Sequence, residues 1–325
     1  MTSRRALLSA PALLAQPARG QQSPTPLDRP ARIVIGFPPG GSVDVVARLY
    51  AEALRGRYAP HVVVESRPGA GARLGMDAVR SATPDGSTML LTPAGGFILH
   101  PTLFPQTVKP EPEAELAPIT TVCALPFALV LAPGHPARDI AGFIAWAKAQ
   151  REPVSYGLPS AGSMAHFTGM QIGRTLGLGL NPVPYRGSAP ALSELMGGHI
   201  PMVVIPLGGV PGLHREGQVR ILATTAPGPL ASLPGVQSFA AAGYPDLAIE
   251  EWFGLFLPAR APAATQAALH QAMLDAAATP ALREGLARIE YTPLTMDSAA
   301  LLARIKRERA HWAQVIHDAG FKVEE

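Results

Sequence analysis

The sequence has a single cysteine and little charge. One cysteine in 325 residues excludes a disulfide within the chain, and it excludes a metal site built from several thiolates. Cys123 lies in the apolar run TVCAL at 121–125, which favours a small buried core residue. A lone buried thiol is compatible with an exported protein that folds without disulfides.

The chain also lacks an excess of basic over acidic residues when residues 1–20 are left out of the count. The chain has 27 lysines and arginines against 24 aspartates and glutamates. Residues 1–20 hold Arg4, Arg5 and Arg19 and no acid, so the remainder is balanced in formal charge. Nucleic-acid-binding surfaces are typically basic. The balance therefore argues against a nucleic-acid partner.

The first twenty residues are typical of a signal peptide. Arg4 and Arg5 form a basic start, residues 6–15 a short apolar run, and ARG at 18–20 a cleavage region with small residues. The apolar run is too short to span a bilayer, which takes about 20 residues. Residues 3–8 also resemble a twin-arginine signal without its usual phenylalanine, so Sec and Tat export both stay open. We expect a periplasmic protein.

Motifs of common enzyme and cofactor classes are absent from the sequence. AGSMA at 161–165 lacks the flanking glycines of a G-x-S-x-G elbow, and no H-E-x-x-H occurs. The glycines at 69–75 depart from G-x-G-x-x-G spacing, and no acid follows about 20 residues later at a strand end. We therefore predict no catalytic residue, no metal and no cofactor.

What the sequence does contain is an alternation of apolar strand-like runs with segments of helical period. This alternation predicts parallel sheets covered by helices. Strands are expected at 33–37, 61–65, 88–92, 119–132, 154–157, 181–185, 200–205, 220–223 and 252–257. Helices are expected at 43–55, 71–80, 140–148, from about 163, and at 189–196, 262–278, 280–287 and 298–319.

Two apolar runs, 119–132 and 252–257, are candidates to connect two sheets. About 300 residues also exceed the usual size of a domain with a single hydrophobic core. We predict an α/β fold of two lobes, each a sheet covered by helices, joined by two crossover strands. Lobe 1 comprises 28–120 plus 245–325, and lobe 2 comprises 121–244. The last helix has an apolar stripe that is expected to dock on lobe 1, with Asp297 or Ser298 at its start and Gly320 at its end.

The segment 32–44 predicts an anion site. A short apolar run ends in a Pro/Gly loop that opens onto an amphipathic helix. The first N–H groups of a helix lack partners within it, and the helix dipole is positive there. Residues 160–166 repeat the design, with Ser163 as N-cap or ligand donor. Two such helix starts that face one cleft would share an anion.

Several motifs resemble the Bug family of periplasmic receptors, the substrate-binding components of tripartite tricarboxylate transporters. They are FPPGGSVD at 37–44, VESRPGAG at 64–71, PDG at 84–86, YRGSAPAL at 185–192, LMGG at 195–198 and WFGL at 252–255. The similarity covers about residues 28–323. It implies a type II-like periplasmic binding fold that closes on a small carboxylate and delivers it to membrane subunits. We expect a monomeric receptor without enzymatic activity.

The resemblance also implies that backbone N–H groups and small hydroxyls from loops of both lobes hold the ligand. The implied residues are Phe37, Pro38, Gly40, Gly41, Ser42, Asp44, Thr92, Ala94, Gly95, Ser160, Ala161, Ser163, His166, Tyr185, Arg186, Gly187 and Ile205. Ile205 stands where family members often carry Asp. This departure disfavours ligands whose ammonium group needs a carboxylate, and it favours apolar or aromatic acids and polycarboxylates.

Some of these residues also have purely structural interpretations. Asp44 suits the first turn of a helix through the dipole alone. His166 is expected to support the site through hydrogen bonds. Arg186 either pairs with the ligand carboxylate, lies solvated at the rim, or forms a salt bridge between the lobes. Trp252 is expected to serve packing or a hinge. Two other functions stay open: a sensor that docks on a signalling partner, and an exported hydrolase that depends on Ser163.

Overall fold

The computed structural model describes residues 27–109, 111–230 and 232–318. The expected signal peptide at 1–20 and the expected helix end at Gly320 lie outside the described residues. Within the described ranges, no helix combines the length and apolarity needed to cross a bilayer.

The first sheet contains three parallel strands with a fourth strand antiparallel to them. Strand β1 lies between β2 and β3, and β10 pairs with the other edge of β3. The strands are β1 (Ala31–Ile35), β2 (Val62–Ser66), β3 (Thr88–Pro93) and β10 (Glu250–Pro258). The apolar faces of α1 (Ser42–Leu54), α9 (Ala263–Ala277) and α10 (Pro280–Ala287) form one core with this sheet, while α2 (Arg73–Arg80) contributes to a second core.

The second sheet has its own set of strands and helices. Strand β5 lies parallel between β6 and β7, and β8 pairs with the parallel strand β9. The strands are β5 (Val154–Leu158), β6 (Leu180–Pro184), β7 (Met202–Pro206), β8 (Arg220–Thr224) and β9 (Gln237–Ser238). The helices are α5 (Ile140–Lys148), α6 (Met164–Leu176), α7 (Ser188–Met196) and α8 (Val210–Arg215).

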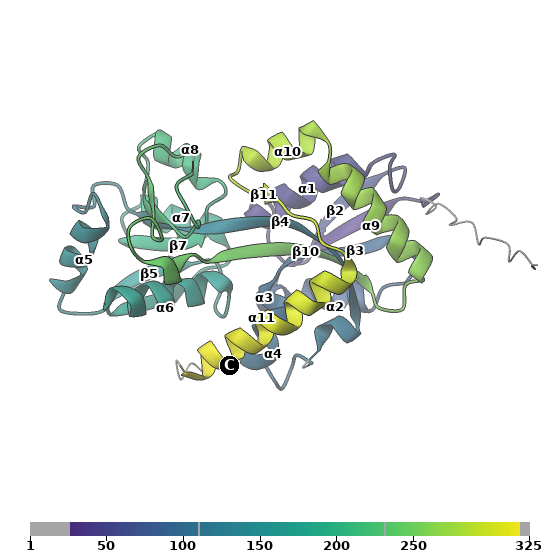
Figure 1. Ribbon diagram of the computed structural model, residues 1–325, viewed down its shortest axis with the longest axis horizontal. Helices are drawn as coiled ribbons and strands as arrows, with labels where there is room; N and C mark the ends of the chain where they lie inside the picture. The colour runs from purple at the N-terminus through teal and green to yellow at the C-terminus, as the bar shows by residue number, and fades with distance from the viewer. Residues whose placement is uncertain (1–26, 110, 231, 319–325) are drawn as a thin grey trace, which may run out of the picture.

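Strand β4 (Leu116–Leu131) joins the two sheets, and β10 runs antiparallel beside it. The first part of β4 pairs with β10, whose Glu250 stands opposite Pro126, and the part from Phe127 onward pairs with β7 and β8. Figure 1 shows β4 and β10 crossing the middle of the molecule between two groups of helices. The predicted α/β fold of two sheets joined by two crossover strands is confirmed.

Helix α11 (Ser298–Asp318) reaches further than the sequence predicts. Its start is capped by Asp297, whose carboxylate accepts a hydrogen bond from the Ala300 N–H at 2.7 Å. The helix packs on β4 and on α3 (Gly95–Ile98), as docking on the first sheet requires. Near its C-terminus, however, the ring of Trp312 lies 6.1 Å from that of Phe167 in α6. The helix therefore also contacts the second group of helices.

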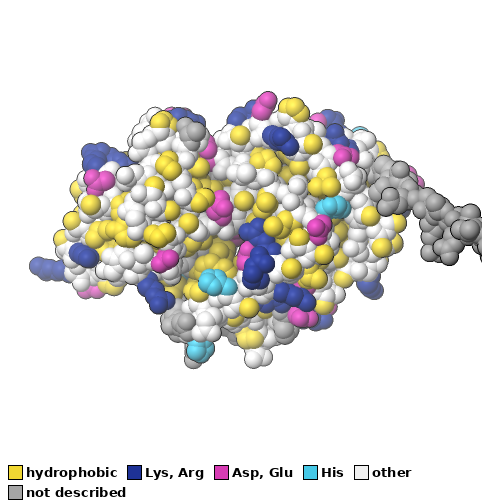
Figure 2. Space-filling view, viewed as in Figure 1, with side chains coloured by type: hydrophobic (Ala, Val, Ile, Leu, Met, Phe, Trp, Pro, Cys, Tyr) yellow, Lys and Arg dark blue, Asp and Glu magenta, His cyan; other side chains and the backbone are white. Residues whose placement is uncertain are grey.

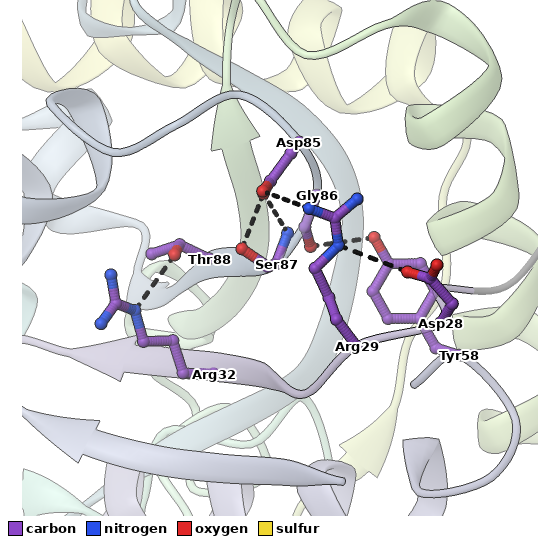
Figure 3. A network of polar contacts seen from close by, with 8 residues as sticks. All are labelled: Asp28, Arg29, Arg32, Tyr58, Asp85, Gly86, Ser87 and Thr88. Atoms are coloured by element: carbon purple, nitrogen blue, oxygen red, sulfur yellow. Dashed lines mark hydrogen bonds and ion pairs between the residues drawn. The ribbon is translucent and has the colours of Figure 1, made fainter. Parts of the chain in front are cut away.

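The PDG motif at 84–86 forms a structural turn (Figure 3). The carboxylate of Asp85 accepts hydrogen bonds from the N–H and the hydroxyl of Ser87, at 2.9 and 2.6 Å, and Arg29 lies 3.2 Å from it. The hydroxyl of Tyr58 donates to the Gly86 carbonyl at 3.0 Å. Because Gly86 has a φ of +86° and a Cβ there would lie 2.6 Å from that hydroxyl, only glycine fits. The motif therefore orients the entry into β3.

Candidate ligand-binding site

A cavity of about 90 Å³ lies where loops of the two sheets meet. The loops after β1 and β3 contribute to it from one side, and the loops after β5 and β6 contribute from the other. Ten predicted residues line it: Phe37, Pro38, Gly41, Ser42, Thr92, Gly95, Ser160, Ser163, Arg186 and Gly187. The starts of α1 and α6 thus face one shared space.

The start of α1 has free hydrogen-bonding capacity because no side chain caps it. Gly41 is the N-cap residue, with extended backbone (φ −81°, ψ 172°), and no side chain accepts a hydrogen bond there. The buried carboxylate of Asp44 instead accepts hydrogen bonds from Gly40 N–H at 3.0 Å and from Arg48 Nε at 2.9 Å. Burial acts to raise the pKa of Asp44, but these hydrogen bonds and the positive charge of Arg48 outweigh it and hold the pKa below its usual range. Gly40 and Asp44 therefore shape the loop and do not line the cavity.

The start of α6 is built differently. Ser163 is its N-cap and accepts a hydrogen bond from the His166 N–H at 3.4 Å. Nδ1 of the buried His166 accepts one from the Gly162 N–H at 3.1 Å. Burial lowers the pKa of His166 to about 4, so its ring is neutral at pH 7 and can accept this bond. His166 and Ala161 thus belong to the loop, and neither lines the cavity.

Three further predicted residues also lie off the cavity. Ala94 is buried, and its N–H donates to the Trp252 carbonyl at 3.0 Å. Ile205 points into the core of the second sheet, whereas its neighbour Pro206 lines the cavity, because successive strand residues face opposite sides. Tyr185 lines an adjoining cavity that it shares with Arg186.

Among the cavity residues that the sequence did not predict are Gly71, His100, Phe127, Glu251 and Phe253. Gly71 ends one of the recognised motifs, so a signal for it existed. A Cβ at Gly71 would lie 3.5 Å from the His100 ring and 3.9 Å from Ser160 Oγ. The backbone of the first sheet's loop therefore approaches the second at this point.

His100 and Glu251 give the cavity two buried titratable groups. His100 begins α4 (His100–Leu103), and burial, with a smaller effect of Arg73, lowers its pKa to about 4. Glu251 lies in β10, where burial, with a smaller effect of Glu308, raises its pKa to about 8. Both groups are therefore largely uncharged at pH 7. Neither has a local sequence signal, because burial depends on distant segments.

Two sheets joined by crossover strands, with two helix starts facing one cavity, define the class of periplasmic solute-binding proteins. The chain belongs to the tripartite tricarboxylate transporter receptor family, whose model, "Tripartite tricarboxylate transporter family receptor", matches residues 46–321. The members of this family are solute-binding proteins and not enzymes.

Individual relatives agree with this assignment. Protein BugT from Bordetella pertussis is 30% identical over 300 residues, which cover 91% of this chain and 90% of BugT. The structure of periplasmic binding protein BugD matches with a TM-score of 0.83 and 27% identity, over 92% of this chain and 100% of BugD. MatC from Rhodopseudomonas palustris, solved with bound malate, matches with a TM-score of 0.80 and 25% identity, over 89% of this chain and 99% of MatC.

Proposed function

We propose that the protein captures a small carboxylate in the periplasm and delivers it to the membrane subunits of a tripartite tricarboxylate-type transporter. The observation that carries this proposal is the shared cavity at the starts of α1 and α6. The related MatC, which was solved with malate, supports a carboxylate as the ligand. The proposal includes a monomeric receptor, export through residues 1–20 by Sec or Tat, and lobes at 28–120 plus 245–325 and at 121–244.

The two helix starts would hold the carboxylate together. Backbone N–H groups at Gly41 and Ser42 and the hydroxyl of Ser163 come from different sheets, and Arg186 adds a cation at the wall. A ligand that contacts both sheets binds the arrangement with the sheets together more tightly than any arrangement with them apart. Binding therefore shifts the population toward the closed form.

Thermal denaturation with a panel of carboxylates tests the proposal. Malate, succinate, glutarate, adipate, hexanoate, benzoate and glutamate are each added to the exported protein. We expect at least one to stabilise it by about 2.7 kcal/mol at a concentration 100-fold above Kd, without being consumed. This stabilisation corresponds to a rise in Tm of several degrees. The Ser163→Ala variant is expected to lose much of the effect.

Ser193→Ala is the matched control, because Ser193 lies exposed on α7 and, among the described residues, its hydroxyl donates only to the Ala189 carbonyl. This variant should respond to the ligand as the unmodified protein does. A panel in which no carboxylate raises Tm would contradict the proposed function.

A further inference from the structure

Glu251 carries a carboxyl group into the ligand cavity. Residues alternate in direction along a strand, so Glu251 and Phe253 of β10 share one face, and both line the cavity. Their neighbours Glu250 and Trp252 point the other way. Glu251 is only 6% exposed. An acid at such a place requires a physical explanation, since the ionised form loses most of its hydration.

No group among the described residues donates a hydrogen bond or forms an ion pair with the Glu251 side chain. The neighbouring acid Glu308 differs, because it accepts hydrogen bonds from Arg304 Nε at 2.6 Å and from Trp252 Nε1 at 2.8 Å. The carboxyl oxygens of Glu251 are not sealed within the protein but are open to the cavity. Glu251 is therefore placed to form its hydrogen bond with something that enters the cavity.

The negative charge of Glu308 favours the neutral form of Glu251, and the cation on the wall of the ligand cavity is Arg186. Behind β10 lies a larger cavity of about 820 Å³, which Glu251 also lines, together with Asp246, Glu250 and Glu308. Figure 2 shows acidic, basic and histidine side chains around a hollow between the two halves on this face. Arg174 is the permanent cation there, and the imidazole of His311 lies on the same wall, while the Cys123 and Tyr291 groups on the β4 and β11 side have pKa values that burial raises, so they remain neutral.

We propose that Glu251, in its protonated form, donates a hydrogen bond to the second carboxylate of a dicarboxylate whose first carboxylate lies at the starts of α1 and α6. Glu251 is thus a specificity-determining residue. The inference rests on the proposed function and names the substrate class for the same site. A protonated carboxyl has one O–H donor, whereas an ionised one only accepts and would repel the ligand. The raised pKa of Glu251, about 8, agrees with a proton held at pH 7.

Isothermal titration calorimetry between pH 6.5 and 9.5 tests this inference with matched pairs of ligands. Each dicarboxylate (succinate, glutarate, adipate) is compared with the monocarboxylate of equal length (butyrate, pentanoate, hexanoate). We expect the best dicarboxylate to bind at least tenfold more tightly than its partner at pH 7. Its affinity should fall about tenfold per pH unit above the pKa of Glu251 in the unliganded protein, about 8, because the ionised form must take up a proton to bind. The monocarboxylates should show little dependence on pH in this range.

Two Glu→Gln variants distinguish the effect of the Glu251 carboxyl from that of other acidic groups nearby. Glu251→Gln supplies a permanent N–H donor, so we expect it to keep the preference for the dicarboxylate and to lose most of the decline at high pH. Glu250→Gln makes the same change at the exposed neighbour on the other face of β10 and should leave the pH profile unchanged. Circular dichroism and Tm verify that both variants fold.

Several outcomes would overturn the inference. One is a dicarboxylate affinity that is independent of pH, and another is a Glu251→Gln profile that follows the unmodified protein. A third is tighter binding of 6-aminohexanoate than of adipate, strengthening at high pH, since Glu251 would then act as an anion beside an ammonium group. In all three cases carboxylates still bind, which leaves the proposed function intact. Binding of no carboxylate at all would instead refute the proposed function.

Discussion

Gly208 and Tyr291 meet where the loop after β7 approaches the segment before β11 (Thr292–Pro293). A Cβ added to Gly208 would lie 2.8 Å from Cε1, Cζ and the hydroxyl oxygen of the Tyr291 ring. That ring is buried and packs edge-on against Phe253, with centroids 6.0 Å apart, and Phe253 lines the ligand cavity. Gly208 has no positive φ, so alanine there acts through its volume alone. The methyl group of Gly208→Ala would therefore clash with the Tyr291 ring and hold the two sheets apart at this contact.

The size of the effect follows from overpacking. An extra methyl group in a well-packed contact costs about 1–3 kcal/mol. This free-energy cost applies when the two sheets lie as close together as in the structure, and it disappears when they move apart. A ligand that needs both sheets must overcome this cost. Since 1.4 kcal/mol corresponds to a factor of ten in Kd, we expect the affinity to fall by roughly 5- to 150-fold.

Calorimetric titration with the best ligand of the carboxylate panel measures this loss. Gly212→Ala is the control, because Gly212 lies in α8 with no atom within 4 Å of an added Cβ. A double-mutant cycle with Tyr291→Ala isolates the contact, since Gly208→Ala should cost little affinity once the ring is removed. If Gly208→Ala binds as tightly as Gly212→Ala does, the two sheets do not meet in the ligand-bound form at this contact, and the reasoning fails.

Three further predictions concern stability. Gly86→Ala should lower Tm by several degrees, because φ is +86° and the new Cβ would lie 2.4 Å from a methyl carbon of α9. Glu113→Ala should cost about 1.5–3 kcal/mol in urea denaturation, since it removes the half-buried ion pair of 2.5 Å between Glu113 and Arg309, whereas Glu111→Ala at an exposed site should cost little. The pKa of His100 is about 6.5 in the unfolded chain and about 4 in the folded protein. Between these values the unfolded chain binds more protons than the folded protein does, so the free energy of unfolding should fall by about 3 kcal/mol as the pH drops from 6.5 to 4. His100→Gln should flatten that part of the stability curve, and an unchanged slope would place the titration elsewhere.

Element positions could be predicted where the signals are local. The bounds predicted for α5 and α10 agree with the structure, Ile140–Lys148 and Pro280–Ala287. Each helix begins at a side-chain cap: Asp139 accepts from the Gly142 N–H at 2.7 Å, and Thr279 accepts from the Leu282 N–H at 3.4 Å. Such hydrogen bonds join residues three positions apart, so the sequence contains both partners within one turn.

The short helices after β3 could not be predicted in this way. The sequence predicts no helix between residues 80 and 140, but the structure forms α3 and α4 there. Phe97 of α3 stacks on Phe256 of β10, with ring centroids 4.0 Å apart, and α3 packs against α11. Helices of four residues are marginal by themselves. Contacts with segments more than 150 positions away stabilise them.

The sequence by itself determined the two helix starts at Gly41 and Ser163, because a strand, a loop of small residues and a helix are adjacent in the chain. Only the tertiary structure decided that both face one cavity and that Glu251 and His100 lie in its wall. Burial is a property of the packed chain, and it sets whether a carboxyl or an imidazole carries charge. The anion-binding geometry is thus local, whereas the chemistry at the far end of the cavity depends on how distant strands and helices pack.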